Sequence, residues 1–293
     1  FFRSRIRDDE RLEEMLAAQA CRGEPLKALQ KMYHITNEER TEIIRPNAEN
    51  AQEPVGSMGD DTPMAVLSQQ IRHVGDFFRQ QFAQVTNPPI DPLREAIVMS
   101  LQTCLGAETN VFAPSARDAH RIILSSPVLS ASKMQQLENL ADPAFQMARI
   151  DLNYDANLEL AAAIKAICKQ VASSIRAGYT LIVLSDKNIA ADKLPANAIM
   201  VTGAVHHYLI AQGIRTDANL IIETGLARDS HQVAVLIGFG ATCVYPYLAY
   251  DVIDDLVATG ELLGDPIQAR VNFRKGLDKG LLKILSKMGI STI

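Results

Sequence analysis

Three continuous apolar runs stand in the second half of the chain, and each ends in a polar or turn residue. They cover Thr180–Leu184, Asn219–Ile222 and Ala241–Val244. Strands that are apolar on both faces are typical of parallel sheets covered by helices on both sides. The segments between the runs have helical spacing. The pattern therefore predicts consecutive parallel βα units.

The βα series begins before these three runs. A strand is predicted over Met147–Leu152 and a helix over Asn157–Ala177, with Gly178 suited to the position that follows a helix. A last long helix is predicted over Gln268–Met288 and ends before Gly289. Repeated βα units are consistent with a (β/α) barrel or with an open doubly wound sheet. We favour an α/β fold with barrel-like (β/α) repeats.

The first part of the chain is less regular. Charged segments with apolar residues at helical spacing predict short helices before residue 50. A short strand is predicted over Met64–Leu67 and a helix over Gln69–Phe82. We therefore expect an N-terminal helical segment, residues 1–50, that packs on an α/β domain formed by residues 51–293.

Composition excludes several classes of protein. The hydrophobic fraction of 47% and the charged fraction of 22% are those of an ordinary globular domain. The net charge of −5 gives no basic footprint for nucleic acid. No apolar run reaches membrane-spanning length and no secretory signal opens the chain, so a cytoplasmic protein is expected. Because the chain begins at Phe1 rather than at a methionine, we expect a piece of a longer polypeptide.

Cysteine and histidine spacing does not predict a metal site. The four cysteines, at positions 21, 104, 168 and 243, match neither a zinc nor an iron–sulfur signature. Cys168 and Cys243 lie in apolar patterns that favour buried, reduced thiols. Adjacent His206 and His207 point about 100° apart on a helix and cannot readily share one metal.

Polar residues at the predicted strand ends are the candidate site, because ligands and chemistry gather at the carboxyl ends of parallel strands. Asp186 and Glu223 are the strand-end candidates for acid/base chemistry. A purely structural hydrogen bond is the more common role for such a residue. Asp229 could join them, or it could cap the helix that follows. The full set of candidates is Ser185, Asp186, Glu223, Thr224, Tyr245 and Pro246.

A phosphate or flavin site receives little support from the residues. Lys187, Arg215 and Arg228 lie in loops and could bind phosphate, but no glycine-rich turn precedes a helix nearby. The run Gly238–Gly240 follows a helix and precedes a strand, which is the wrong order for a dinucleotide fingerprint. We expect a helix end and a tight turn there.

Five segments, in order, resemble the central domain of the large subunit of bacterial-type glutamate synthase. The resemblance spans nearly the whole chain. It is carried by EPVGSMGDDTPMAVLS, FAQVTNPPIDPLRE, LIVLSDKNIAADKLPANAIMVTGAVHHYLI, LIIETGLARDSHQVAVLIGFGATCVYPYLAYD and KGLLKILSKMGISTI. The resemblance implies a topology similar to the flavin-binding barrel that follows this domain in the family.

The resemblance also implies a function in glutamate biosynthesis and ammonia assimilation. A domain of this kind links a glutaminase domain to a synthase domain with FMN and an iron–sulfur cluster, within an oxidoreductase that has a small NADPH-dependent subunit. The central domain itself is expected to hold no cofactor and no catalytic residue. The family's glutamine-cleaving cysteine opens a separate domain, and Phe1 is not that cysteine.

The resemblance places part of an ammonia tunnel in this chain. By matching position, the tunnel-lining residues are Met58, Thr62 and Thr86. The residues alone favour simpler roles, because Met58 could fill a core gap and Thr86 could cap a turn. Two other functions stay open from sequence: a free-standing flavin- or phosphate-binding (β/α) barrel enzyme, and a regulatory ligand-binding module.

Overall fold

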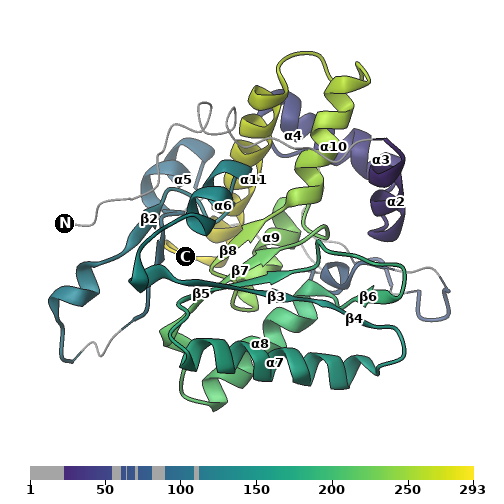
Figure 1. Cartoon of the computed structure of the whole chain (residues 1–293). Coiled ribbons are helices and arrows are strands. Elements are labelled where there is room, and N and C mark those ends of the chain that lie inside the picture. The colour runs from purple at the N-terminus through teal and green to yellow at the C-terminus, as the bar shows by residue number, and fades with distance from the viewer. Residues whose placement is uncertain (1–22, 55–60, 64, 70–71, 81–89, 109–111) are drawn as a thin grey trace.

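The centre of the protein is a four-stranded parallel sheet (Figure 1). The computed structural model describes residues 23–54, 61–63, 65–69, 72–80, 90–108 and 112–293. The sheet has the strand order β3-β5-β7-β8. Its strands are β3 (Met147–Asp151), β5 (Leu181–Ser185), β7 (Asn219–Glu223) and β8 (Cys243–Tyr245).

The parallel pairing that the apolar runs predict is confirmed. Leu181 lies opposite Asn219, and Ile221 lies opposite Cys243, in parallel register. All five residues of β5 are buried, as expected for a strand covered on both faces. The four strands stand side by side in the sheet in the same order as they occur in the chain. A segment of a (β/α) barrel has this order. Within the described residues this sheet is open, so closure into a barrel stays a prediction.

Helices cover both faces of the sheet. In Figure 1, α7 (Leu160–Arg176) and α8 (Ala198–Ala211) lie below the strands, and α10 (Tyr247–Ala258) and α11 (Pro266–Met288) lie above them. The shorter α9 (Ser230–Gly238) contacts both α8 and α11. This arrangement encloses the apolar strands in a core that both helical layers share.

Local sequence sets several helix ends. The Asp229 side chain accepts a hydrogen bond from the Gln232 amide and caps α9, which is the structural role weighed for it. Asp265 caps α11 in the same way. Gly289 follows α11 with φ of 71°, a conformation that favours glycine. The turn predicted at Gly238–Gly240 is also present after α9.

Helices form in the described part of the N-terminal segment, as predicted. Their bounds are α2 (Glu24–Met32), α3 (Asn37–Glu39), the π-helical turn η1 (Arg40–Ile44) and α4 (Arg45–Asn50). They lie against α10 and α11. The division of the chain at residue 50 stays a prediction.

Smaller elements surround the sheet. Two antiparallel pairs flank it, and two further helices stand between the N-terminal segment and β3. These elements are β1 (Thr103–Leu105) with β2 (Ile122–Leu124), β4 (Asn153–Asp155) with β6 (Lys193–Pro195), α5 (Pro92–Val98) and α6 (Ala131–Glu138). Single 3-10 turns occur at Val74–Phe77, Ala116–Ala119, Pro143–Phe145 and Arg215–Asp217.

Two predicted elements of the first half are wrong. The strand expected over Met64–Leu67 is a turn at residues 66 and 67, with both side chains exposed; Met64 lies outside the described residues. The helix expected over Gln69–Phe82 is reduced, in its described part, to the 3-10 turn Val74–Phe77. Short apolar runs do not distinguish strands from turns, and Gly75 lowers the helix propensity of the second segment.

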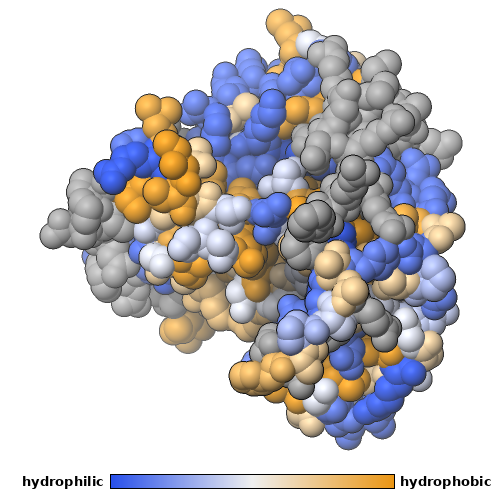
Figure 2. Space-filling view, turned by 90° about the vertical axis from the view of Figure 1, so that its left-hand side faces the viewer, coloured by the Kyte–Doolittle hydropathy of each residue, from blue (hydrophilic) through white to orange (hydrophobic). Residues whose placement is uncertain are grey.

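Figure 2 shows the side of the molecule on which α5 and β2 are seen in Figure 1. Apolar side chains gather on part of this face, beside strongly hydrophilic ones. In the described part of the chain, no helix combines the length and the apolar character that crossing a membrane requires.

Gly280 lets α9 approach α11 closely. A Cβ added at this position would lie 2.5 Å from the Ser230 Cβ, closer than real Cβ atoms come. We expect Gly280→Ala to lower the free energy of unfolding by about 1–3 kcal/mol, although alanine is favoured by about 1 kcal/mol over glycine in a helix. Urea denaturation measures the change.

Gly238→Ala is the matched control, because an added Cβ at Gly238 meets nothing within 4 Å. This variant should be neutral or slightly stabilised. Equal stability of the two variants would show that the contact between Ser230 and Gly280 is not tight.

Candidate functional site

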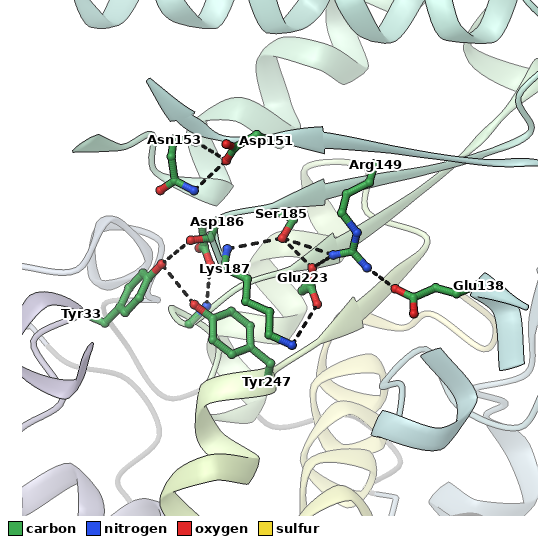
Figure 3. A network of polar contacts seen from close by, with 11 residues as sticks. Tyr33, Glu138, Arg149, Asp151, Asn153, Ser185, Asp186, Lys187, Glu223 and Tyr247 are labelled. Carbon is green, nitrogen blue, oxygen red and sulfur yellow. Dashed lines mark hydrogen bonds and ion pairs between the residues drawn. The ribbon is translucent and has the colours of Figure 1, made fainter. Parts of the chain in front are cut away.

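Two strand ends bring the predicted acidic residues together. Ser185, the last residue of β5, lies opposite Glu223, the last residue of β7, in the parallel register. Asp186 and Thr224 follow them directly in sequence, and all four residues are buried. Because successive residues of an extended chain point to opposite sides, Asp186 and Glu223 enter two different polar clusters (Figure 3).

The first cluster is centred on the Glu223 carboxylate. Ser185 donates a hydrogen bond of 2.5 Å to Glu223 Oε2, and Arg149 from β3 forms an ion pair with the same oxygen. The Lys187 ammonium lies 3.8 Å from Glu223 Oε1. Arg149 also pairs with Glu138 of α6. The buried Glu223 carboxylate is therefore compensated by two cations and a hydroxyl, as a buried charge requires.

Arg149 and Lys187 connect this cluster with the surface. Their side chains are 34% and 49% exposed, whereas the Glu223 side chain is 2% exposed. The Lys187 ammonium also lies over the Tyr247 ring, 5.5 Å from its centre. A general base needs a lone pair that a substrate can reach. Ser185 and Arg149 both occupy Glu223 Oε2, and the side chain is almost fully buried, so the geometry favours a structural anchor.

The second cluster surrounds Asp186, which is completely buried. Its carboxylate accepts hydrogen bonds from the Thr224 hydroxyl at 2.5 Å and from the Gly225 amide at 3.1 Å. Burial raises the pKa of Asp186 to about 6, and these hydrogen bonds oppose the rise. A carboxyl with no exposed surface can hold the loop after β7, but a substrate cannot contact it directly.

Two tyrosines join the N-terminal segment to the Asp186 cluster. The Tyr33 hydroxyl donates to the backbone carbonyl of Asp186 at 3.0 Å, and the Tyr247 hydroxyl donates to Tyr33 at 3.2 Å. Burial is the main cause that raises the pKa of both phenols. The Arg228 guanidinium, also buried, pairs with Glu39 and donates to the Tyr33 carbonyl. The segment after α2 is thereby fastened to the strand ends.

Sequence reasoning missed Arg149, Tyr33 and Tyr247. Arg149 had a weak signal, because it is a charged residue within an otherwise apolar strand pattern. Tyr33 had none, since its contact with Asp186 joins residues 153 positions apart in the chain.

The loop cations considered for phosphate binding are used within the fold. Arg215 donates to His206 Nδ1 at 3.0 Å and to two backbone carbonyls, those of Ala218 and Gly240. The Arg228 guanidinium ties the N-terminal segment in place, and Lys187 belongs to the Glu223 cluster. The hydrogen bonds of Arg215 and Arg228 occupy donors that a phosphate would need.

The remaining strand-end candidates have backbone or packing roles. The Tyr245 carbonyl accepts from the Thr224 amide at 3.1 Å, and its ring packs 6.0 Å from the ring of Tyr250. Pro246 precedes the first residue of α10. Tyr245 therefore pairs with the residue after β7, and Pro246 leads from the end of β8 into α10.

No group of three or more potential metal ligands occurs among the residues that the structure describes. The rings of His206 and His207 meet edge to face, 5.4 Å apart. Cys168 and Cys243 are buried thiols, and burial raises the pKa of both.

Two of the three tunnel candidates, Met58 and Thr86, lie outside the described residues. Thr62 is exposed, and its carbonyl accepts a hydrogen bond of 2.7 Å from Arg79. The tunnel assignment of all three residues stays a prediction.

Removing the Tyr33 hydroxyl should weaken the attachment of the N-terminal segment. Tyr33→Phe leaves the Tyr247 hydroxyl and the Asp186 carbonyl without this buried partner. We expect a loss of about 1–3 kcal/mol in the free energy of unfolding, the cost of an unsatisfied buried polar group. Thermal and urea denaturation measure it.

Tyr179→Phe is the matched control, because Tyr179 is 37% exposed. Its stability should stay within about 0.5 kcal/mol of the parent chain. A Tyr33→Phe variant as stable as the Tyr179→Phe variant would contradict the anchoring role.

Comparison with known proteins gives consistent results. The glutamate synthase central domain model matches residues 28–293. The chain is 38% identical to "Glutamate synthase [NADPH] large chain" of Azospirillum brasilense over 300 residues, which cover 98% of this chain and 20% of that protein. It is 38% identical to the large chain of Bacillus subtilis over 264 residues, with coverage of 90% and 17%.

The chain thus spans a fifth or less of the length of these relatives. "Glutamate synthase [NADH]" of Schizosaccharomyces pombe is 40% identical over 268 residues, with coverage of 89% of this chain and 13% of that protein. Among solved structures, a flavocytochrome b2 mutant matches 59% of this chain and 38% of its own, at 12% identity and a TM-score of 0.37. A structural similarity this low supports no statement about function.

Proposed function

Because this chain belongs to the glutamate synthase central domain family, we propose that it links a glutaminase domain to a synthase domain in a glutamate synthase large chain. The observation that carries the proposal is the family match over residues 28–293. Relatives named as glutamate synthase large chains, aligned over 90% and 98% of this chain, support it.

The part of this domain in the reaction is that of a scaffold and an ammonia passage. Ammonia released from glutamine must reach 2-oxoglutarate without being protonated or lost, so the passage has to exclude water. Met58, Thr62 and Thr86 are the proposed lining residues. Apolar walls with a few hydroxyl groups suit a small neutral molecule.

The strand-end clusters support a role without catalysis in this domain. Both oxygens of Glu223 have partners within the fold, and Asp186 is fully buried. Neither carboxylate offers a substrate an accessible oxygen for acid/base chemistry. The chemistry would then take place in the flanking domains.

The whole enzyme would contain partners that this chain does not supply. We propose a cytoplasmic oxidoreductase in which FMN and an iron–sulfur cluster belong to the domain that follows. A small NADPH-dependent subunit would deliver the electrons. Of the relatives, the two bacterial large chains carry NADPH in their names.

The test uses the full-length large chain with Met58→Trp. A larger aromatic side chain should block the passage, so that glutamine is still hydrolysed to glutamate and ammonia while the reductive formation of a second glutamate from 2-oxoglutarate falls. External ammonia should then partly restore glutamate formation if the flavin site stays accessible. The measurement is the ratio of glutamine consumed to 2-oxoglutarate consumed, because glutamine hydrolysis alone also releases glutamate.

Met200→Trp is the control, because Met200 is exposed on α8 and the substitution is the same. It should leave one glutamine consumed for each transfer. Tight coupling in the Met58→Trp enzyme would show that the passage does not run past Met58.

The competing function, a free-standing flavin- or phosphate-binding enzyme, has its own test. Titration of the purified chain with FMN, followed by flavin fluorescence, should give no saturable quenching. Tight saturable binding would favour the enzyme over the linking domain.

A further inference from the structure

The outer face of α5 is apolar, contrary to the usual arrangement of a surface helix. Leu93 and Ile97 are four residues apart and share one face, and each is 81% exposed. Glu95 instead points inward and is 6% exposed. A helix on a surface that faces only solvent turns its apolar stripe to the core and its charged residues to water. This inversion indicates that the outer face of α5 is normally covered.

The apolar surface continues from α5 to the end of α11. Helices α5 and α11 are in contact. Met288, the last residue of α11, is exposed, and so are Ile290 and Ile293 after it. We call the set Leu93, Ile97, Val98, Met288, Ile290 and Ile293 the α5 surface. Figure 2 shows the side of the molecule on which α5 lies.

Backbone pairing holds the last residues of the chain beside α5. Thr292 forms a parallel bridge with Ser100, which stands two residues after the end of α5. The Ser100 amide donates to the Ser291 carbonyl at 2.7 Å. Any polypeptide that continues from Ile293 therefore starts next to the α5 surface. Tethering of this kind gives it a high effective concentration there.

We propose that the α5 surface is the docking surface for the polypeptide that follows Ile293 in the full-length large chain. The inference rests on the proposed function, which makes this chain one domain of a longer enzyme. The relatives contain several times more polypeptide than this chain covers. The occupant is an apolar helix or strand face of the following domain, since contact with such a face removes the large aliphatic side chains from water.

Thiol labelling of the full-length chain tests whether the surface is covered. Ile97→Cys and Leu263→Cys are compared, because Ile97 and Leu263 are 81% and 89% exposed in this domain. A water-soluble maleimide is applied under native conditions, and labelling is read peptide by peptide by mass spectrometry. The thiol of the Ile97→Cys variant should react about tenfold more slowly than that of the Leu263→Cys variant, which corresponds to about 1.4 kcal/mol for opening the interface. Equally fast labelling of both thiols would overturn the proposal.

Photo-cross-linking from position 97 identifies the occupant. A photoreactive phenylalanine analogue replaces Ile97 in the full-length chain, and the linked peptides are sequenced. Links to residues that follow Ile293 in the same chain are expected. Links to the preceding domain, to another subunit or to a second copy would overturn the assignment of the occupant. This result also decides the case in which both introduced thiols react slowly.

An assay of 2-oxoglutarate conversion to glutamate, with glutamine as the ammonia donor, on the same preparation separates this inference from the proposed function. An active enzyme with a freely labelled position 97 overturns the docking surface and leaves the proposed function standing. An inactive enzyme with position 97 protected and linked to the following polypeptide supports the docking surface and counts against the proposed function.

Discussion

The Asp254→Ala variant is expected to lose about 3–5 kcal/mol of unfolding free energy, because the substitution breaks a buried ion pair. Asp254 and Arg270 form a buried ion pair between α10 and α11, with side chains 1% and 7% exposed. Arg270 Nε donates to Asp254 Oδ1 at 2.8 Å, and Nη2 donates to Oδ2 at 2.5 Å. Loss of the carboxylate removes both of these charge-assisted hydrogen bonds from the buried guanidinium.

Two further variants separate the charge from the packing. Asp254→Leu combined with Arg270→Met should recover most of the stability, because it removes both buried charges together and keeps the volume. Lys283→Ala removes an exposed ion pair with Glu53 and should cost no more than about 1 kcal/mol. Urea denaturation measures all of these. An Asp254→Ala cost as small as that of Lys283→Ala would show that the pair contributes no more than a surface pair.

Stability should fall as pH rises from about 4 to about 6, in part because of Asp186. The folded state raises the pKa of this carboxyl from 3.8 to about 6, chiefly by burial. Within that window the folded chain keeps a proton that the unfolded chain releases, so increasing pH favours unfolding. A shift of about two units corresponds to about 3 kcal/mol, fully lost above the folded pKa.

Asp186→Asn tests this assignment because its side chain does not titrate. The amide oxygen can still accept from Gly225, and its NH2 group can donate to Thr224. The stability of the variant relative to the parent chain should rise by about 3 kcal/mol between pH 4 and pH 6 and then stay level. Parallel stability curves for the two chains across this window would contradict the prediction.

Asp278 provides an independent comparison. It is half-buried, its hydroxyl partner is Ser126, and desolvation raises its pKa to about 6. Asp278→Asn should change the pH dependence in the same direction as Asp186→Asn. Both variants can be followed in one series of urea denaturations at stepped pH.

The sequence alone determined the elements whose signals are local. A run such as Leu181–Ser185 is apolar throughout its first four residues, which predicts a strand covered on both faces. The cap at Asp229 depends on an amide three residues away, and the end of α11 depends on the conformation of Gly289. Parallel strands end at the same edge of a sheet, so the two apolar runs also predicted that Ser185 and Glu223 lie close together.

Only the tertiary structure decided what those strand-end residues do. Glu223 is an anchor because Arg149, 74 positions away, reaches it across the sheet. Asp186 is tied to the N-terminal segment because Tyr33, 153 positions away, donates to its backbone carbonyl. Contacts between distant residues depend on how helices pack on the sheet, and periodicity carries no information about that. The outward direction of the apolar face of α5 also depends on the tertiary structure. Its apolar residues would predict a core-facing stripe, and the fold turns them to the surface.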